Sequence, residues 1–292
     1  MKMEVSGKTR VCGVIGDPVA HSLSPAMHNA AFEHLRLDYV FLAFRVKAAE
    51  VENAVRGMRA FGIHGLNVTM PHKNAVIAYL DEVNETARRL GSVNTILNHN
   101  GRLRGFSTDG TGALQALRQN GVELGGKKVL LLGAGGAAKA GAFALAGEAA
   151  EVVVLNRTPE KAKDLAEALS QKLGKKVVGG SLSPRSIQEH LRDADVLVNA
   201  TSAGMHPFPE QSLVKPEWLK PSLAVMDMVY NPLETRLAKD AKAAGAHVVS
   251  GVEMLIYQGA ASFEIWTGRK APVEVMRKAA LSNLAATAGE ES

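Results

Sequence analysis

The stretch Val129-Leu130-Leu131-Leu132-Gly133-Ala134-Gly135-Gly136-Ala137-Ala138 joins an apolar run to a glycine-rich turn and an alanine-rich segment. The apolar run predicts a buried strand, and the alanines favour a helix. Gly133 permits a tight turn, Gly135 lets the backbone approach a pyrophosphate, and the small Ala138 allows the helix to pack closely on the strand. A glycine turn alone is a weak signal, but its place between a strand and a helix predicts a dinucleotide-binding unit.

Apolar runs continue beyond this turn, which indicates a parallel sheet covered by helices on both faces. We expect strands at Val152–Leu155, Val196–Asn199, Leu223–Met228 and His247–Ser250, and a helix at Ala137–Ala146. Strands that alternate with helices in this way are typical of a doubly wound sheet.

The residues before the glycine turn show the same alternation. Ser24-Pro25 predicts a helix N-cap followed by proline at the first helical position, with the helix running to about Leu37. Asn100-Gly101, between two strand patterns, predicts a tight hairpin. The other expected elements are strands at Val11–Ile15, Tyr39–Val46, Gly65–Met70, Val93–Asn98 and Arg102–Phe106, and helices at Ala49–Ala60 and Glu85–Leu90.

The chain ends in two helical patterns, near Val252–Thr267 and Pro272–Ala286, with no strand between them. We expect Phe263 and Trp266 to anchor the first of these helices to the N-terminal domain. The predicted fold class is α/β, with an N-terminal α/β substrate domain, a Rossmann-type doubly wound dinucleotide-binding domain, and C-terminal helices packing back on the first domain. We place these three parts at residues 1–108, 109–250 and 251–292.

Composition restricts the class of protein. A chain of 292 residues can form two cores, and 46% hydrophobic with 22% charged residues is ordinary for a globular protein. Cys12 is the single cysteine, which excludes an intramolecular disulfide and suits a reducing compartment. The sequence shows neither the apolar core of a signal peptide nor a membrane-spanning run, so we expect a cytoplasmic protein. The net charge of +5 is spread along the chain, so neither nucleic acid nor membrane is an expected partner.

Asn156-Arg157-Thr158 follows the second strand of the dinucleotide unit and bears on the choice of cofactor. An NAD site usually has an acid here on the ribose 2′-hydroxyl, and that acid would repel a 2′-phosphate. Arg157 can bind a 2′-phosphate through paired charge-assisted hydrogen bonds, and Lys161 adds a second positive charge. The two residues could also form a solvated helix start, but the missing acid favours NADP over NAD.

Lys73 follows a strand in the segment Asn67-Val68-Thr69-Met70-Pro71-His72-Lys73. Asn67 and Thr69 alternate toward one face of this strand, which makes that face either a solvent edge or a pocket wall. A lysine after a turn is usually solvated, but polar neighbours make Lys73 a candidate acid–base residue. Asp109 is either a helix N-cap or the partner of Lys73, and its spacing alone favours the cap.

Further motifs occur in a fixed order along the chain. They are Ser22-Leu23-Ser24-Pro25, Gly91-Ser92-Val93-Asn94-Thr95, Thr108-Asp109-Gly110, Asn199-Ala200-Thr201-Ser202-Ala203-Gly204, Asp227-Met228-Val229-Tyr230-Asn231-Pro232 and Gly251-Val252-Glu253-Met254-Leu255-Ile256-Tyr257-Gln258. Together with the lysine segment, the glycine turn and Asn156-Arg157-Thr158, they resemble the shikimate dehydrogenase family over essentially the whole chain. A glycine turn occurs in many families, whereas this ordered set is specific.

The resemblance implies reversible, NADP-dependent reduction of 3-dehydroshikimate to shikimate, a step of aromatic amino-acid biosynthesis. It makes Lys73 the acid–base residue with Asp109 beside it, and places Ser22 and Ser24 on the substrate carboxylate. The resemblance also implies that five residues surround the rest of the substrate: Thr69, Asn94, Asp109, Tyr230 and Gln258. It lines the cofactor NADP with Gly133, Ala134, Gly135, Gly136, Ala137, Asn156, Arg157, Thr158, Lys161, Val229 and Gly251.

Two positions depart from the family's pattern: Ser107 stands where asparagine is common, and Val229 where methionine is frequent. The first departure weakens any amide contact at that position, and the second alters packing near the nicotinamide.

Some alternatives remain open. The activity could be that of a broader quinate/shikimate dehydrogenase that uses NAD, or the chain could be a non-catalytic, ligand-sensing relative. The sequence leaves the oligomeric state open, with a homodimer as one possibility. No metal is expected, because none of His21, His28, His64 and His72 has zinc-ligand spacing with supporting cysteines.

Overall fold

The computed structural model describes residues 5–290 and divides the chain into two compact units. The first unit contains the residues up to Thr108 and those from Ile256 onward, and the second runs from Asp109 to Leu255. One connection lies at the start of a helix, and the other lies inside a helix. The expected α/β class is confirmed in both units.

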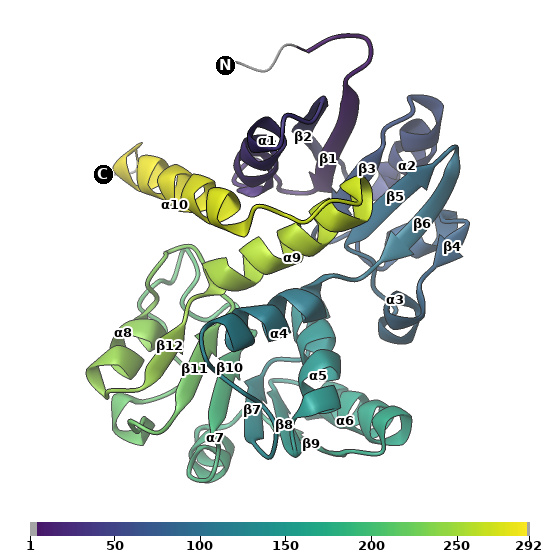
Figure 1. The fold of residues 1–292 in the computed structure, drawn as a ribbon. Helices are drawn as coiled ribbons and strands as arrows, with labels where there is room; N and C mark the ends of the chain where they lie inside the picture. The colour runs from purple at the N-terminus through teal and green to yellow at the C-terminus, as the bar shows by residue number, and fades with distance from the viewer. Residues whose placement is uncertain (1–4, 291–292) are drawn as a thin grey trace. The chain divides into compact units, whose positions relative to one another are not determined.

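A mixed sheet with strand order β2-β1-β3-β5-β6-β4 forms the centre of the first unit (Figure 1). Its strands are β1 (Arg10–Gly16), β2 (Tyr39–Arg45), β3 (Gly65–Val68), β4 (Glu82–Val83), β5 (Thr95–His99) and β6 (Arg102–Phe106). The helical elements are α1 (Ser24–His34), η1 (Ala48–Glu50), α2 (Val51–Ala60), η2 (Ala75–Tyr79), α3 (Glu85–Leu90), the later part of α9 (Gly251–Thr267), and α10 (Val273–Glu290). Strand β1 is parallel to β2 and β3, whereas β5 is antiparallel to β3 and β6.

Alternate residues of β3 face two different cores. Leu66 packs in an aliphatic core with Val55 and Met58 of α2. On the other face, Gly65 lies so close to Trp266 of α9 that a Cβ there would come within 2.4 Å of the indole nitrogen. A side chain at Gly65 would therefore displace α9.

The expected anchoring of the first C-terminal helix by Phe263 and Trp266 is confirmed. Both side chains are buried, and the Trp266 Nε1 donates a hydrogen bond to the Ile96 carbonyl at 3.0 Å. Phe263 packs against Phe32 of α1, with 5.3 Å between the ring centroids. These contacts attach α9 to β5 and α1 within the first unit.

Helix α1 differs at both ends from its predicted bounds. Leu23, not Ser24, occupies the N-cap position and makes no side-chain capping bond, so Ser24 is the first residue of the helix. The helix ends at His34 rather than near Leu37, because Arg36 has a left-handed φ of 52°.

The predicted hairpin is confirmed. Asn100 and Gly101 have φ values of 53° and 85°, the positive values that a two-residue type I′ turn requires. His99 pairs with Arg102 across the turn.

A parallel sheet with strand order β12-β11-β10-β7-β8-β9 forms the centre of the second unit (Figure 1). Its strands are β7 (Lys128–Leu132), β8 (Glu151–Asn156), β9 (Lys176–Ser181), β10 (Val196–Asn199), β11 (Ala224–Asp227) and β12 (His247–Val249). The helical elements are α4 (Asp109–Gln119), α5 (Gly136–Glu148), α6 (Pro159–Leu173), α7 (Pro184–Leu191), η3 (Pro216–Trp218), α8 (Arg236–Ala243) and the start of α9. This is the Rossmann strand order, which reverses direction between β7 and β10.

Helices cover both faces of this sheet, as its continuous apolar strands predict. Helices α7 and α8 bury Ile187 and Leu237 against Leu130, Val153 and Val225 on one face. Helix α5 packs on β7 and β8 and also contacts α4 and α6. Right-handed crossovers place α5 and α6 on the face opposite α7 and α8.

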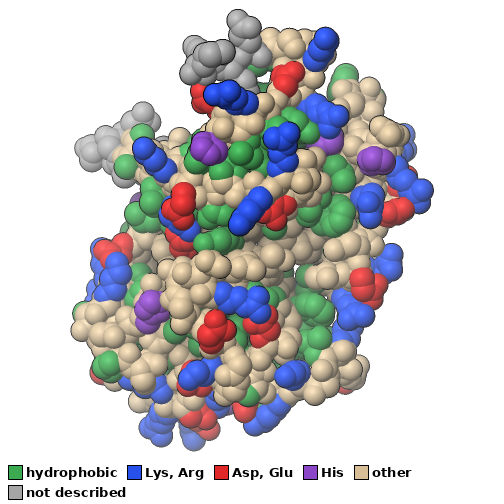
Figure 2. All heavy atoms as spheres, viewed as in Figure 1, with side chains coloured by type: hydrophobic (Ala, Val, Ile, Leu, Met, Phe, Trp, Pro, Cys, Tyr) green, Lys and Arg blue, Asp and Glu red, His purple; other side chains and the backbone are tan. Residues whose placement is uncertain are grey.

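The surface carries mixed charge. Figure 2 shows Lys and Arg side chains interspersed with Asp and Glu on the face in view. Many of these charges are paired, as in Lys128 with Asp193 at 2.6 Å and Arg45 with Asp17 at 2.7 Å. Within residues 5–290, no helix is long and apolar enough to cross a membrane.

Candidate active site

Polar segments of the first unit meet at one edge of its sheet. Strands β1, β3 and β6 end at this edge, and β5, which is antiparallel to β3 and β6, begins there. The register pairs Thr95 with both Asn67 and Phe106. The loops after β1, β3 and β6 and the segment before β5 therefore lie side by side. They carry Ser22, Thr69, Lys73, Asn94 and the end of the first unit at Thr108.

The two serines predicted to bind a carboxylate lie at the start of α1. The Ser22 hydroxyl accepts a hydrogen bond from the Ser24 amide at 3.3 Å, and Ser24 is buried as the first helical residue. No acidic residue occupies the first turn of α1. A helix N-terminus favours an anion because its first amide groups lack helical partners.

The backbone around Lys73 is held between two strand ends. The Thr69 amide donates to the Ile15 carbonyl at 2.9 Å, and the Lys73 carbonyl accepts from the Val93 amide at 2.8 Å. His72 is buried, and its Nε2 lies 2.6 Å from the Val46 carbonyl. The half-buried Lys73 side chain therefore begins from a fixed backbone.

Asn94 connects the segment of Lys73 to the residue before Asp109. Its Oδ1 accepts from the Thr108 amide at 2.8 Å, and its Nδ2 lies 3.3 Å from Oε1 of Gln258 on α9. Asp109 is buried and is the first residue of α4, so it lies inside the helix rather than before it as an N-cap would. The first unit thus brings Asn94 and Gln258 together.

Behind Asn94 lies a set of polar side chains that we call the buried polar cluster. Its members, each at most 5% exposed, are Asn67, Asn94, Thr95, Thr108 and Ser262. The sequence motifs contain Asn67, Asn94, Thr95 and Thr108, of which Asn94 has a predicted substrate contact, and they do not include Ser262. The four-residue spacing of Ser262 from Gln258, which puts both on one face of a helix, was the available signal.

His28 is the buried histidine of α1, and its environment makes folding sensitive to pH. Its ring is fully buried and stacks on Phe41, with centroids 4.5 Å apart. Burial lowers the pKa of His28 from its ordinary value of 6.5 to about 3. Because the unfolded chain binds the proton more tightly, stability from neutral His28 is complete above pH 6.5 and is lost as the pH falls toward 3.

We expect His28→Phe, which keeps an aromatic ring in the stack, to flatten the acid side of the stability profile. Each unit of pH below 6.5 should remove about 1.4 kcal/mol from the unfolding free energy of the wild type on account of this residue. Urea unfolding between pH 5 and 7.5 measures both profiles, and the partly buried His64 contributes equally to each. Parallel profiles would show that His28 is not the group responsible.

The second unit presents its predicted cofactor residues at the carboxyl ends of its strands. Gly133 follows β7 with a φ of 110°, and a Cβ there would lie 2.9 Å from the Ala200 carbonyl oxygen, so glycine is required. A Cβ at Gly135 or Gly136 would meet no protein atom within 4 Å. The absence of side chains there is therefore not a demand of packing, and it fits close approach of a phosphate to the start of α5.

The side chain of Asn156, at the end of β8, supports the glycine turn. Its Oδ1 accepts from the Ala134 amide at 3.2 Å, and its Nδ2 donates to the Thr158 carbonyl at 3.0 Å. Arg157 and Lys161 are exposed beside it, where α6 begins. Two positive side chains next to the glycine turn fit a phosphate on the ribose of a dinucleotide.

A buried carboxylate fixes the loop after β11. Asp227 accepts from the Asn199 Nδ2 at 2.9 Å, from the Val229 amide at 3.1 Å and from the Thr235 hydroxyl at 2.6 Å. Burial raises the pKa of this carboxyl, although the three donors oppose the shift. Tyr230, predicted to contact substrate, lies on the same loop in the second unit.

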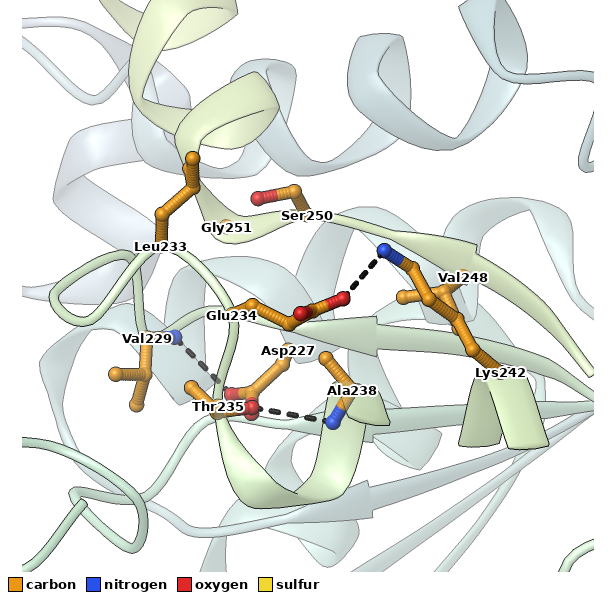
Figure 3. A pocket seen from close by; sticks show the side chains of 10 residues that line it. All are labelled: Asp227, Val229, Leu233, Glu234, Thr235, Ala238, Lys242, Val248, Ser250 and Gly251. Atoms are coloured by element: carbon orange, nitrogen blue, oxygen red, sulfur yellow. Dashed lines mark hydrogen bonds and ion pairs between the residues drawn. The ribbon is translucent and has the colours of Figure 1, made fainter. Parts of the chain in front are cut away.

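Gly251 packs tightly on this loop, since a Cβ there would lie 2.5 Å from the Asp227 carbonyl and 2.6 Å from that of Val229. The loop, the end of β12 and the start of α8 enclose a cavity of about 80 Å³ in the second unit (Figure 3). Val229 and Gly251 both line this cavity. Close packing thus explains the glycine at position 251.

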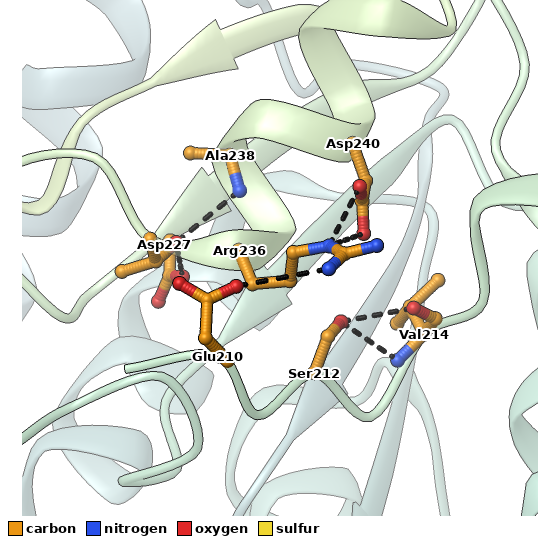
Figure 4. Close-up of polar contacts among 8 residues, drawn as sticks. Glu210, Ser212, Val214, Asp227, Arg236, Ala238 and Asp240 are labelled. Atoms are coloured by element: carbon orange, nitrogen blue, oxygen red, sulfur yellow. Dashed lines mark hydrogen bonds and ion pairs between the residues drawn. The ribbon is translucent and has the colours of Figure 1, made fainter. Parts of the chain in front are cut away.

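A second set of contacts ties α8 to the long loop after β10. Arg236 binds both carboxylate oxygens of Asp240 at 2.9 Å and lies 3.7 Å from Glu210 (Figure 4). In the same loop the Ser212 hydroxyl donates to the Val214 carbonyl at 2.9 Å. Such exposed ion pairs contribute little stability, but they help hold the loop against α8.

The structure bears on both departures from the family pattern. The Ser107 hydroxyl is buried and, among the described residues, has no hydrogen-bond partner. Val229 is buried, and its amide is bonded to Asp227, so its backbone position does not depend on a longer side chain.

The Rossmann unit with its open glycine turn, joined to an α/β unit with a lysine among oriented amides, defines a nicotinamide-dependent oxidoreductase. Three family models match the chain: the shikimate dehydrogenase substrate binding domain at 14–96, shikimate/quinate 5-dehydrogenase at 115–228, and the shikimate 5′-dehydrogenase C-terminal domain at 251–281.

Similar proteins agree with these models. A shikimate dehydrogenase (NADP⁺) of Methanopyrus kandleri is 51% identical over 97% of this chain and 99% of its own. A crystal structure of a shikimate dehydrogenase with NADP⁺ is 42% identical, with a TM-score of 0.91 over 96% of this chain and 98% of that one. The Thermus thermophilus shikimate 5-dehydrogenase, solved with NADP(H) and shikimate, is 42% identical, with a TM-score of 0.84 over 94% of this chain and 100% of that one. This chain belongs to the shikimate dehydrogenase family.

Proposed function

We propose that this chain catalyses the reversible, NADP-dependent reduction of 3-dehydroshikimate to shikimate in aromatic amino-acid biosynthesis. The observation that carries the proposal is that one chain has both Lys73, at a sheet edge lined with amides and hydroxyls, and Arg157, beside the glycine turn. Family membership supports the same conclusion. A cytoplasmic location suits a chain whose single cysteine, Cys12, is a buried thiol.

Lys73 supplies the acid–base chemistry. Reduction of a ketone requires a hydride on carbon and a proton on the oxygen that becomes anionic. NADPH, when bound, supplies the hydride. The Lys73 ammonium hydrogen-bonds to the developing oxyanion and delivers its proton, and in the oxidation direction the amine removes the proton from the hydroxyl. Asp109, the first residue of α4, is the carboxylate that we assign to the same proton transfer.

The remaining residues bind the two ligands. Ser22, Ser24 and the start of α1 bind the substrate carboxylate, while Thr69, Asn94 and Gln258 bind its hydroxyl groups. Tyr230 contributes a phenol from the loop after β11, and burial raises its pKa, which keeps the phenol a neutral donor.

Residues Gly133 to Ala137, with Asn156, Thr158, Val229 and Gly251, hold the cofactor. Arg157 and Lys161 select NADP by contacting its 2′-phosphate.

Absorbance at 340 nm, followed with purified protein, tests this function. We expect rapid NADP reduction with shikimate, a much slower reaction with NAD, and little reaction with quinate. Equal rates with NAD and quinate would indicate the broader quinate/shikimate activity. Binding of shikimate without any turnover would indicate a ligand-sensing protein and contradict the proposal.

A further inference from the structure

Ser262 lies at the centre of the buried polar cluster. Its side chain is on α9 and is fully buried. The hydroxyl lies 3.0 Å from Asn67 Nδ2, 2.8 Å from Thr95 Oγ1 and 3.2 Å from Thr108 Oγ1. It also lies 3.1 Å from the carbonyl of Gln258, to which it donates. A single hydroxyl thus links β3, β5 and the end of the first unit to α9.

The cluster determines which way the amide of Asn94 faces. The Thr108 backbone amide can only donate, so the Asn94 atom 2.8 Å away must be the oxygen. The Asn94 Nδ2 then donates toward Gln258 Oε1 at 3.3 Å. Gln258 Oε1 is therefore an acceptor, and its Nε2 is a donor on the other side of the same amide.

Ser262 controls Gln258 through the helix that both share. The two residues are one turn apart, on the same face of α9. Asn94 is already held by Thr108, and the Ser262 hydroxyl, bonded both to the sheet residues and to the Gln258 carbonyl, helps to fix the turn of α9 that carries Gln258. Without it, Asn67 would keep Asn94 O and Thr95 Oγ1 as acceptors, and the bond from Asn94 to the Gln258 side chain at 3.3 Å would be left to link the cluster to α9.

We propose that Ser262 is a positioning residue that determines substrate specificity by holding the Gln258 amide with its N–H donors toward a substrate hydroxyl. This inference rests on the proposed function, in which Gln258 binds substrate. The recognised group is then a hydroxyl that accepts a hydrogen bond. A site built to hydrogen-bond a hydroxyl discriminates strongly against analogues that lack it, provided that its donors are held in place.

Ser262→Ala tests the proposal through its effects on kcat/KM for shikimate and on the KM for NADP. Loss of one orienting hydrogen bond, worth about 1–1.5 kcal/mol, should lower kcat/KM for shikimate about tenfold. The KM for NADP should not change, because the cofactor does not depend on Gln258. The matched control is Thr267→Val on the same helix. The Thr267 hydroxyl also donates to the carbonyl four residues earlier in the chain, that of Phe263, at 2.8 Å. This control should keep wild-type kcat/KM.

A double-mutant cycle with Gln258→Ala separates positioning from a general structural effect. If Ser262 acts through Gln258, then Ser262→Ala should change kcat/KM less than twofold in the Gln258→Ala background. A tenfold loss in both backgrounds overturns the proposal, as does an unchanged kcat/KM in Ser262→Ala alone.

If Ser262→Ala does not fold, Thr95→Val serves the same purpose, because it removes the hydroxyl 2.8 Å from Ser262 with little change in shape. It should give the same selective loss and the same disappearance of that loss in Gln258→Ala. A wild-type protein that fails to oxidise shikimate would overturn the proposed function and this inference together. An active wild type with additive losses would overturn only the role of Ser262.

Discussion

Lys73→Ala is expected to lower kcat for shikimate oxidation by about 10²–10⁴-fold, the usual contribution of a positioned acid–base group. Binding should change much less, because the contacts to the substrate carboxylate and to the hydroxyls that do not react are made by other residues. Steady-state kinetics with shikimate and NADP give kcat, and shikimate binding by calorimetry gives the affinity. The expected pattern is a large loss of turnover with a nearly normal dissociation constant.

Two further variants sharpen this test. Lys73→Arg keeps a positive charge but cannot release its proton near neutrality, so it should remain almost as slow as Lys73→Ala. Lys47→Ala removes an exposed lysine of the same unit and should leave kcat unchanged. Near-normal turnover in Lys73→Ala would show that Lys73 takes no part in the chemistry and is an ordinary solvated lysine.

Much of the fold could be predicted because its signals are local. Helix α3 has the predicted bounds, Glu85–Leu90, and the apolar run predicted as a strand at Val129–Leu132 is β7, which begins one residue earlier at Lys128. The Asn100-Gly101 turn specifies its own backbone geometry. In each case a few adjacent residues determine the conformation, whatever the rest of the chain does.

Strand β9 could not be predicted in the same way. Its sequence, Lys176–Ser181, contains Gly179 and Gly180, which argue against a strand. The structure shows why Gly179 is tolerated: a Cβ there would lie 2.4 Å from the Ala162 carbonyl of α6. The strand forms by pairing with β8, and Gly179 allows the backbone of α6 to approach it closely; both are tertiary contacts without a local signal.

The buried polar cluster as a whole has no signal in the sequence for a related reason. Ser262 bonds Asn67, which lies 195 residues away in sequence, and no spacing rule connects them. Asp227 is a similar case, because its partner Asn199 is adjacent only through the pairing of β10 with β11. Family motifs indicated which segments matter, whereas the bonds that hold their side chains follow from the packing of distant elements.

Arg157→Ala is expected to raise the KM for NADP about 10- to 100-fold and to leave the slower NAD reaction nearly unchanged. A hydrogen bond between charged groups contributes about 1.5–3 kcal/mol, and tenfold in affinity corresponds to about 1.4 kcal/mol. NAD has no 2′-phosphate, so the substitution removes no contact with NAD. Arg185→Ala, which removes an exposed arginine from α7 in the same unit, should affect neither cofactor.

The comparison of the two cofactors distinguishes recognition from structure. If Arg157 mainly stabilised the start of α6, its removal would disturb the Asn156 side chain that supports the glycine turn through Ala134. NADP and NAD both need that turn, so both reactions would then weaken by the same factor. Equal losses would therefore assign Arg157 a structural role and leave the NADP preference without its physical basis. A loss confined to NADP would show that Arg157 contacts the 2′-phosphate. Lys161→Ala should have a smaller effect that is also confined to NADP, because Lys161 lies one turn further along α6.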